Sequence, residues 1–342
     1  MATINERILD AQVKHSVYLE RYKAGVLKKI IGLLNGTEGD LIVEIAGRLA
    51  NIEQRGYDLG LDATKRLNAL LKAIRDRRTK VYDVLQVKLS DEMDAFAVYE
   101  ADYQIRLADN AGVGIDLVAP SNAQLKAIVT SQPFQGRLLK EWSKGLAFGD
   151  IQRINDAVRI GITSGQTTDQ IVRRIRGTKA AQYQDGIIEI ARRDAEAVVR
   201  TAVGHVQNRA RMEVFSANAD IIPGVQYAAT LDSKTTIICA SRDGTVYALD
   251  KAPPIPAHFR CRSIYVPYFG PRDGNRASKF GPVPASTTYE AFLRKQSADF
   301  QTEVLGVERA RLFRSGRVSL TKFVEKSGRS YTLKELARRE KS

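Results

Sequence analysis

The sequence predicts an α+β fold that is predominantly α-helical. Apolar residues recur at helical spacing through most of the 342 residues, the one clear β-type pattern is a small unit near residues 224–268, and a basic segment closes the chain. The length allows two or three domains. We predict five regions: an elongated N-terminal helical scaffold (1–110), a central helical block (121–220), a small β-rich module (221–268), a flexible linker (269–288) and a flexible, basic C-terminal arm (289–342).

The N-terminal region has the pattern of three long amphipathic helices. Residues 4–34 carry apolar side chains at steps of three and four, which places them in one stripe. His15 lies on that stripe, and we interpret it as a packed interface residue and not as a ligand. Thr37, followed three residues later by an acidic residue, predicts the start of a second helix. A third pattern runs from about residue 62 to 108, and a break near Ser90 stays open.

The central block begins with a capping pattern formed by Ser121 and Gln124. A glycine-containing break at 161–165 separates two helical patterns, and Thr167 with Gln170 predicts where the second begins. Two short helices around a turn are also the layout of a helix-turn-helix DNA reader. We favour an ordinary helical hairpin, because no recognition helix can be distinguished from surface charge here.

The β-type pattern begins after Gly224. Val225–Leu231 alternates apolar with more polar residues, as expected of a half-buried strand. The pair Asp243 and Gly244 is a turn signal, and a proline-rich loop then leads to a last apolar run at 264–267. We therefore predict a compact β unit at this point of the chain.

The charge favours a polyanionic partner. The chain has 53 Lys and Arg against 39 Asp and Glu, a net charge of +14, and from Arg309 onward there are eleven basic and three acidic residues. Such a surplus attracts nucleic acid or an acidic protein surface, although a solvated tail that only aids solubility is the alternative. The predicted contact residues are Arg192, Arg193, Arg209, Arg211, Arg311, Arg314, Arg317, Lys322, Lys326 and Arg329.

Common catalytic motifs are missing from the sequence. It has no glycine-rich phosphate loop, no G-x-S-x-G elbow and no H-E-x-x-H, and its three histidines lie far apart in sequence. We predict no catalytic residue and no enzyme. The alternative is a metal-dependent nuclease that uses His258 and nearby acidic residues.

The sequence shows no sign of a membrane or secreted protein. No apolar run is long enough to span a bilayer, and the N-terminus lacks a signal-peptide pattern. The two cysteines fit a reducing setting.

Three residues of the β unit could ligate a metal ion. Cys239, His258 and Cys261 include an H-x-x-C spacing, but zinc usually takes four nitrogen or sulfur ligands. Asp232 or Asp243 could supply the fourth, which is uncommon for a structural site. The alternative is that both cysteines are small core residues and that His258 caps a loop. We favour this alternative, so we expect no cofactor and consider zinc unlikely.

One stretch of about 65 residues resembles a known family. It has an Arg-Thr pair on a helix, a strand, a D-x-x-T motif, a D-G turn and P-x-H-x-x-C-R, in this order. These motifs resemble those of the phage head morphogenesis family, the minor capsid proteins similar to protein F of phage Mu. Thr236 and Ser263 stand where the family pattern has cysteines. The motif residues are Arg200, Thr201, Asp232, Thr235, Cys239, Asp243, Gly244, His258, Cys261 and Arg262.

The resemblance implies a low-copy structural protein of a tailed-phage head. Such a protein docks on the portal or the inner capsid, and its basic residues would contact packaged DNA without sequence specificity. The implied partners are the portal protein, the major capsid protein and packaged double-stranded DNA, with no membrane. The implied location is the phage head, with host cytoplasm during assembly. A cytoplasmic DNA-binding protein unrelated to particles is the remaining alternative.

Overall fold

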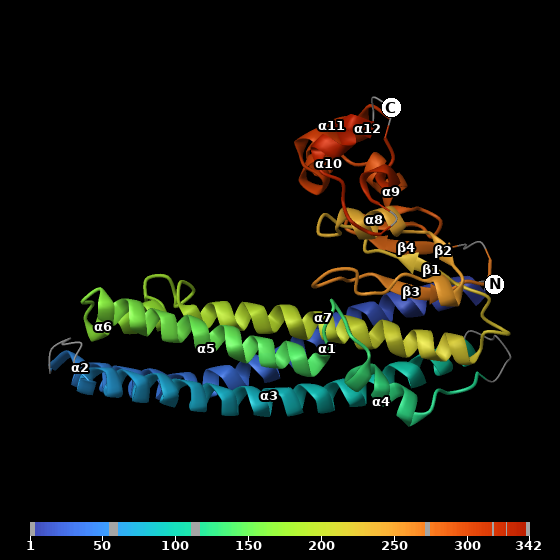
Figure 1. Cartoon of the computed structure of the whole chain (residues 1–342). Coiled ribbons are helices and arrows are strands. Elements are labelled where there is room, and N and C mark those ends of the chain that lie inside the picture. The colour runs from blue at the N-terminus through green and yellow to red at the C-terminus, as the bar shows by residue number, and fades with distance from the viewer. Residues whose placement is uncertain are drawn as a thin grey trace. The chain divides into compact units, whose positions relative to one another are not determined.

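The computed structural model describes residues 4–54, 61–110, 117–270, 274–316, 318–325 and 327–339. It confirms a predominantly helical α+β fold (Figure 1). The contacts divide the chain into two compact units. We call Tyr22–Asp94 with Val129–Ala202 the helical unit, and Met1–Arg21, Ala95–Ile128 and Val203–Ser342 the mixed unit.

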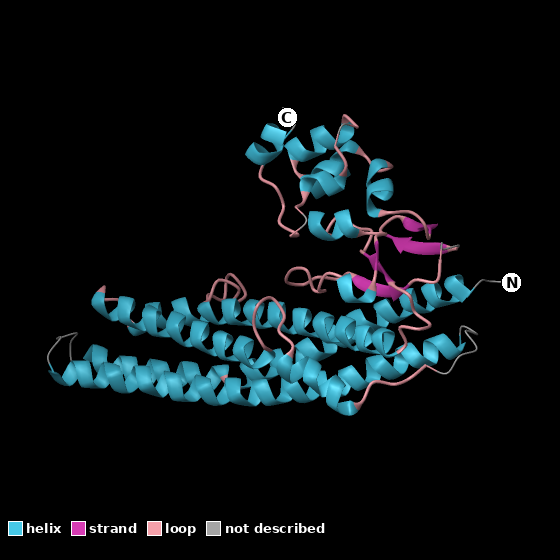
Figure 2. Ribbon diagram, turned by 45° about the vertical axis from the view of Figure 1, so that its right-hand side comes forward, coloured by secondary structure: helices cyan, strands magenta, loops and turns pink. Residues whose placement is uncertain are grey.

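Long helices lying side by side form the helical unit (Figure 2). It contains α2 (Glu38–Gln54), α5 (Leu139–Thr163) and α6 (Thr168–Arg176). It also holds parts of the helices that continue into the other unit: α1 (Ile4–Gly36), α3 (Leu61–Asn110), α4 (Asn122–Ser131) and α7 (Ile187–Ala217). Its buried core includes Leu41, Ile45, Leu49, Leu70, Ile74, Ile154, Val158, Ile171 and Ile175.

The helix starts follow the capping chemistry of the sequence at most points. The Thr167 hydroxyl accepts from the backbone N–H of Gln170, and the Gln170 side chain accepts from the backbone N–H of Thr167, a complete capping box. Ser121 forms the same pair of hydrogen bonds with Gln124. Thr37 differs, because its hydroxyl donates to the carbonyl oxygen of Leu34 at 3.2 Å and so ends α1. The third helix is continuous over 50 residues, with no break near Ser90.

The β unit of the mixed unit is a three-stranded antiparallel sheet. Strand β1 (Val225–Ala228) lies between β2 (Val246–Tyr247) and β3 (Ile264–Pro267). In this register Tyr227 is opposite Tyr265, and the two buried rings meet edge to face at 5.6 Å. The predicted strand at 225 and the predicted apolar run at 264–267 are confirmed, although β1 is three residues shorter than its pattern.

The predicted flexible linker is wrong for residues 275–284. These residues form a hairpin of β4 (Asn275–Ser278) and β5 (Gly281–Pro284). The Ser278 hydroxyl donates to the Gly281 carbonyl oxygen, and Gly281 has φ +109°, a backbone conformation that suits glycine. Glycine, proline and serine in this stretch therefore build a tight hairpin instead of a flexible strap.

The basic C-terminal segment is also folded. It contains α9 (Tyr289–Arg294), α10 (Ala298–Leu305), α11 (Val307–Arg314), the 3₁₀ helix η2 (Leu320–Phe323) and α12 (Leu333–Arg339). Their apolar side chains form a core with Leu231 and Ala240 of the β unit. The segment is thus a packed set of short helices and not the flexible arm that its charge suggested. The core residues it supplies are Tyr289, Phe292, Leu293, Phe300, Leu305, Ala310, Phe313, Val318, Leu320, Phe323 and Leu336.

Candidate functional site

The candidate site is a cluster of three side chains beside the sheet of the β unit. Cys239 lies on the short helix α8 (Ile237–Arg242), while His258 and Cys261 lie on the loop between the 3₁₀ helix η1 (Leu249–Lys251) and β3. Cys239 Sγ is 3.2 Å from His258 Nε2 and 3.6 Å from Cys261 Sγ. One ligand atom from each of the three residues lies within 4.8 Å of the others. The structure therefore brings together the three residues that are separated by up to 22 positions.

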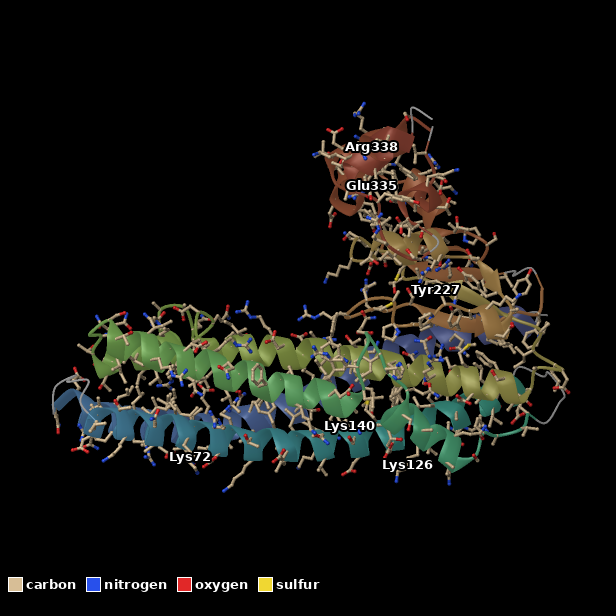
Figure 3. All side chains as sticks on the ribbon, viewed as in Figure 1. Lys72, Lys126, Lys140, Tyr227, Glu335 and Arg338 are labelled. Carbon is tan, nitrogen blue, oxygen red and sulfur yellow. The ribbon has the colours of Figure 1, made fainter. Side chains whose placement is uncertain are left out.

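Strand β1 supplies a further group to the cluster. The buried hydroxyl of Tyr227, which Figure 3 labels, donates to Cys239 Sγ at 3.2 Å. The Ser263 side chain, at the start of β3, also hydrogen-bonds Cys239. Our sequence reasoning missed both contacts. The alternation of the strand placed Tyr227 on the buried face, but nothing in the pattern shows which sulfur its hydroxyl would meet.

The two carboxylates considered as fourth ligands have other partners. Asp232 accepts two hydrogen bonds from the guanidinium of Arg262, at 2.5 and 2.8 Å. Asp243 pairs with Arg276 and accepts from the backbone N–H groups of Ala229 and Tyr289, each at 2.7 Å. Neither residue joins the Cys–His cluster among the described residues. Both carboxylates tie strands and helices together, and neither is placed as a fourth ligand of the cluster.

The pKa values of the two thiols in the cluster are shifted in opposite directions. The hydrogen bond with Cys261, followed by burial, raises the pKa of the Cys239 thiol. The same contact lowers the pKa of the Cys261 thiol well below its ordinary value, and the hydrogen bond and charge of His258 lower it further against the effect of burial. Burial would lower the pKa of His258, but the hydrogen bond and charge of Cys261 outweigh it and raise this pKa. These opposite directions favour the thiolate form at Cys261 and the thiol form at Cys239.

The site is poorly suited to nucleophilic catalysis. Cys239 and Cys261 are 1% and 2% exposed, so a substrate cannot reach either sulfur without displacing the surrounding residues. A nuclease would also need carboxylates free to hold a metal ion at a phosphate. The two aspartates of the motif, Asp232 and Asp243, are engaged by arginines. No contact in the described residues favours the alternative of a nuclease.

Nine of the ten predicted basic contact residues divide into three groups. Arg193, Arg311, Arg314, Lys322 and Arg329 are exposed, and Arg209 is partly exposed. Arg192 is held by Glu38 and Glu189. Arg317 and Lys326 lie outside the described residues.

Arg211 is a correction to these predictions. It is fully buried, and its Nε donates to Glu100 Oε1 at 2.6 Å, so it cannot contact DNA. The charge count along α7 misled the prediction, because it does not register which helix face is buried. Its partner Glu100 lies 111 residues away in sequence, and no sequence pattern indicates that the two residues would pair.

A comparison with protein families finds a match to part of this chain. Residues 152–266 match the family described as Phage Mu protein F like protein. This range includes every motif residue on which the resemblance rested, from Arg200 to Arg262, so the predicted resemblance is confirmed there. No curated protein and no solved structure matched the chain. Among the described residues, no helix combines the length and apolar character that crossing a membrane requires.

Proposed function

We propose that this chain is a minor structural protein of a tailed-phage head. The observation that carries the proposal is the family match over residues 152–266, because it includes the candidate site and the whole of the long helix α7 before it. The buried thiols and the engaged aspartates support a structural role over an enzymatic one. In this role the protein docks on the portal or the inner capsid wall and is located in the phage head.

Assembled particles test the proposed location. Quantitative mass spectrometry of purified heads should detect this chain at low copy relative to the major capsid protein. Heads assembled without portal should lose it, because docking on the portal is what retains it. A matched comparison is the major capsid protein, whose amount per head should not change. Equal amounts of this chain in heads with and without portal would contradict portal docking, and its absence from heads would contradict the proposed function.

We further infer that the C-terminal helices contact packaged DNA through their exposed cations. Arg311 and Arg314 lie three residues apart on α11, so they share one helix face, and Lys322 follows on η2. All three are exposed. The Arg311 side chain is 70% exposed and its pairing with Glu308 is at 3.3 Å, an ion pair of the kind that contributes little. These residues can therefore exchange their present contacts for phosphate oxygens without burying an unpaired charge.

Replacing Arg311, Arg314 and Lys322 with serine should weaken binding to duplex DNA and flatten its salt dependence. Each lost phosphate contact should reduce the slope of log K against log salt by about 0.9. Fluorescence anisotropy over a salt series measures both the affinity for duplex DNA and its dependence on salt. The matched control replaces Lys29, Lys65 and Lys72 of the helical unit, whose side chains are 67–77% exposed, and removes the same net charge. An equal loss of DNA affinity in both variants, or no binding by the native chain at low salt, would contradict the proposed contact with DNA.

A further inference from the structure

The ligand atoms of the Cys–His cluster have nearly the spacing that a tetrahedral zinc ion requires. Zinc binds thiolate sulfur at about 2.3 Å and imidazole nitrogen at about 2.0–2.1 Å, so tetrahedral ligands lie about 3.8 Å apart for two sulfurs and about 3.5 Å for sulfur and nitrogen. The corresponding distances here are 3.6 Å between the sulfurs and 3.2 Å between Cys239 Sγ and His258 Nε2. An ion could enter with shifts of a few tenths of an ångström.

The orientation of His258 is that of a metal ligand. Its Nδ1 lies 2.8 Å from the carbonyl oxygen of Phe259. A carbonyl oxygen only accepts, so Nδ1 must carry the proton and donate it. This fixes Nε2 as the ring nitrogen that faces Cys239, and a histidine that ligates through one nitrogen commonly donates from the other in this way. A histidine that merely caps a loop would not need its second nitrogen turned toward two sulfurs.

The start of α8 offers a candidate for the fourth ligand. Thr236 is the N-cap of α8, three residues before Cys239, which is the C-x-x-C spacing of many zinc sites with threonine in place of the first cysteine. Its Oγ1 is buried, makes no capping hydrogen bond, and has no hydrogen-bond partner among the described residues. A buried hydroxyl without a partner is uncommon, because it loses its contacts with water and gains none in return. A bound ion, or a water on that ion, would satisfy it.

We propose that Cys239, His258 and Cys261 bind one Zn²⁺ ion, with an oxygen from Thr236 or from water in the fourth position. Two thiolates and one imidazole favour zinc over magnesium or calcium, which take oxygen ligands. The ion would join α8 to the loop before β3. Its role is structural, since both sulfurs are buried. This site stands on its own geometry and does not depend on the proposed function.

Metal analysis of the full chain tests the site. After exhaustive dialysis the purified protein should retain about one zinc ion per chain by inductively coupled plasma mass spectrometry. Co²⁺ added to the metal-free chain should give a thiolate-to-cobalt charge-transfer band and the strong visible bands of tetrahedral coordination. Zinc should also raise the midpoint of thermal unfolding. Absence of both zinc and the cobalt bands, with two freely titrating thiols, would overturn the proposal.

Variants locate the ligands. Cys239→Ala and His258→Ala should each lower zinc affinity by at least tenfold and weaken the cobalt bands, whereas Asp250→Asn, which removes an exposed acidic residue of the same unit, should not. Circular dichroism shows whether each variant is folded. Thr236→Cys places a sulfur at the proposed fourth position and keeps Cys239, His258 and Cys261, so it remains informative if the other variants unfold. It should bind zinc more tightly and strengthen the charge-transfer band. Zinc binding that is unchanged in all of the ligand variants contradicts the site.

Discussion

Replacing Asp150 with alanine is expected to lower the free energy of unfolding by about 3–5 kcal/mol. Asp150 and Arg78 are 0% and 1% exposed and form an ion pair inside the helical unit. Arg78 Nε donates to Asp150 Oδ2 at 2.6 Å, and the Tyr82 hydroxyl donates to the same oxygen at 3.2 Å. Removing the carboxylate leaves a buried guanidinium without its counter-charge. Urea unfolding followed by circular dichroism measures the change.

Two controls separate the buried charge from the loss of a side chain. Asp76→Ala breaks an exposed pair with Lys72, in which the Asp76 and Lys72 side chains are 52% and 74% exposed, and should change stability far less than Asp150→Ala does. Arg78→Met combined with Asp150→Leu and Tyr82→Phe removes all the polar atoms together and should restore most of the lost stability. If Asp150→Ala is no more destabilising than Asp76→Ala, the buried pair does not hold the unit together.

This pair also marks the limit of what the sequence could predict about the fold. The helices and their starts were predictable, because periodicity and capping are local: Thr167 and Gln170 meet across three residues. In the sequence, Arg78 is one member of a run of basic residues between Arg75 and Lys80. Its partner lies 72 residues away, and a run of charges does not indicate which of its members is buried. The same limit explains why the C-terminal segment was expected to be a flexible arm.

The candidate site was predictable in its members but not in its geometry. The motif order singled out Cys239, His258 and Cys261, yet the missing cysteines at Thr236 and Ser263 led us to expect no metal ion. The structure adds the facts that sequence spacing does not contain: the distances among the three ligand atoms and the hydrogen bond from His258 to Phe259. Long-range pairing of β1 with β3 and the path of the intervening loop create these distances, and neither is a local property.

Arg211→Ala is expected to lower the free energy of unfolding by about 3–5 kcal/mol. Arg211 and Glu100 are both fully buried in the mixed unit and form an ion pair. Glu100 also contacts His15 Nε2 at 2.6 Å, and Arg211 donates to the carbonyl oxygen of Tyr265 at 3.3 Å. The pair therefore connects α1, α3 and α7 with β3. Arg209→Ala, two residues away on the same helix and partly exposed, is the matched control and should have a small effect in the same urea titration.

The pH dependence of stability tests whether the charge of Glu100 carries this effect. Burial would raise the pKa of Glu100, but Arg211 and the hydrogen bond with His15 outweigh burial and lower it. Because the folded pKa lies below the unfolded value of about 4.3, the stabilising contribution is complete above that pH and is lost as the pH falls through the folded pKa. Native chain and Glu100→Gln should thus differ most in unfolding free energy near neutral pH and converge in acid. A difference that stays constant from neutral to acid pH would show that shape, and not charge, is what the buried network requires.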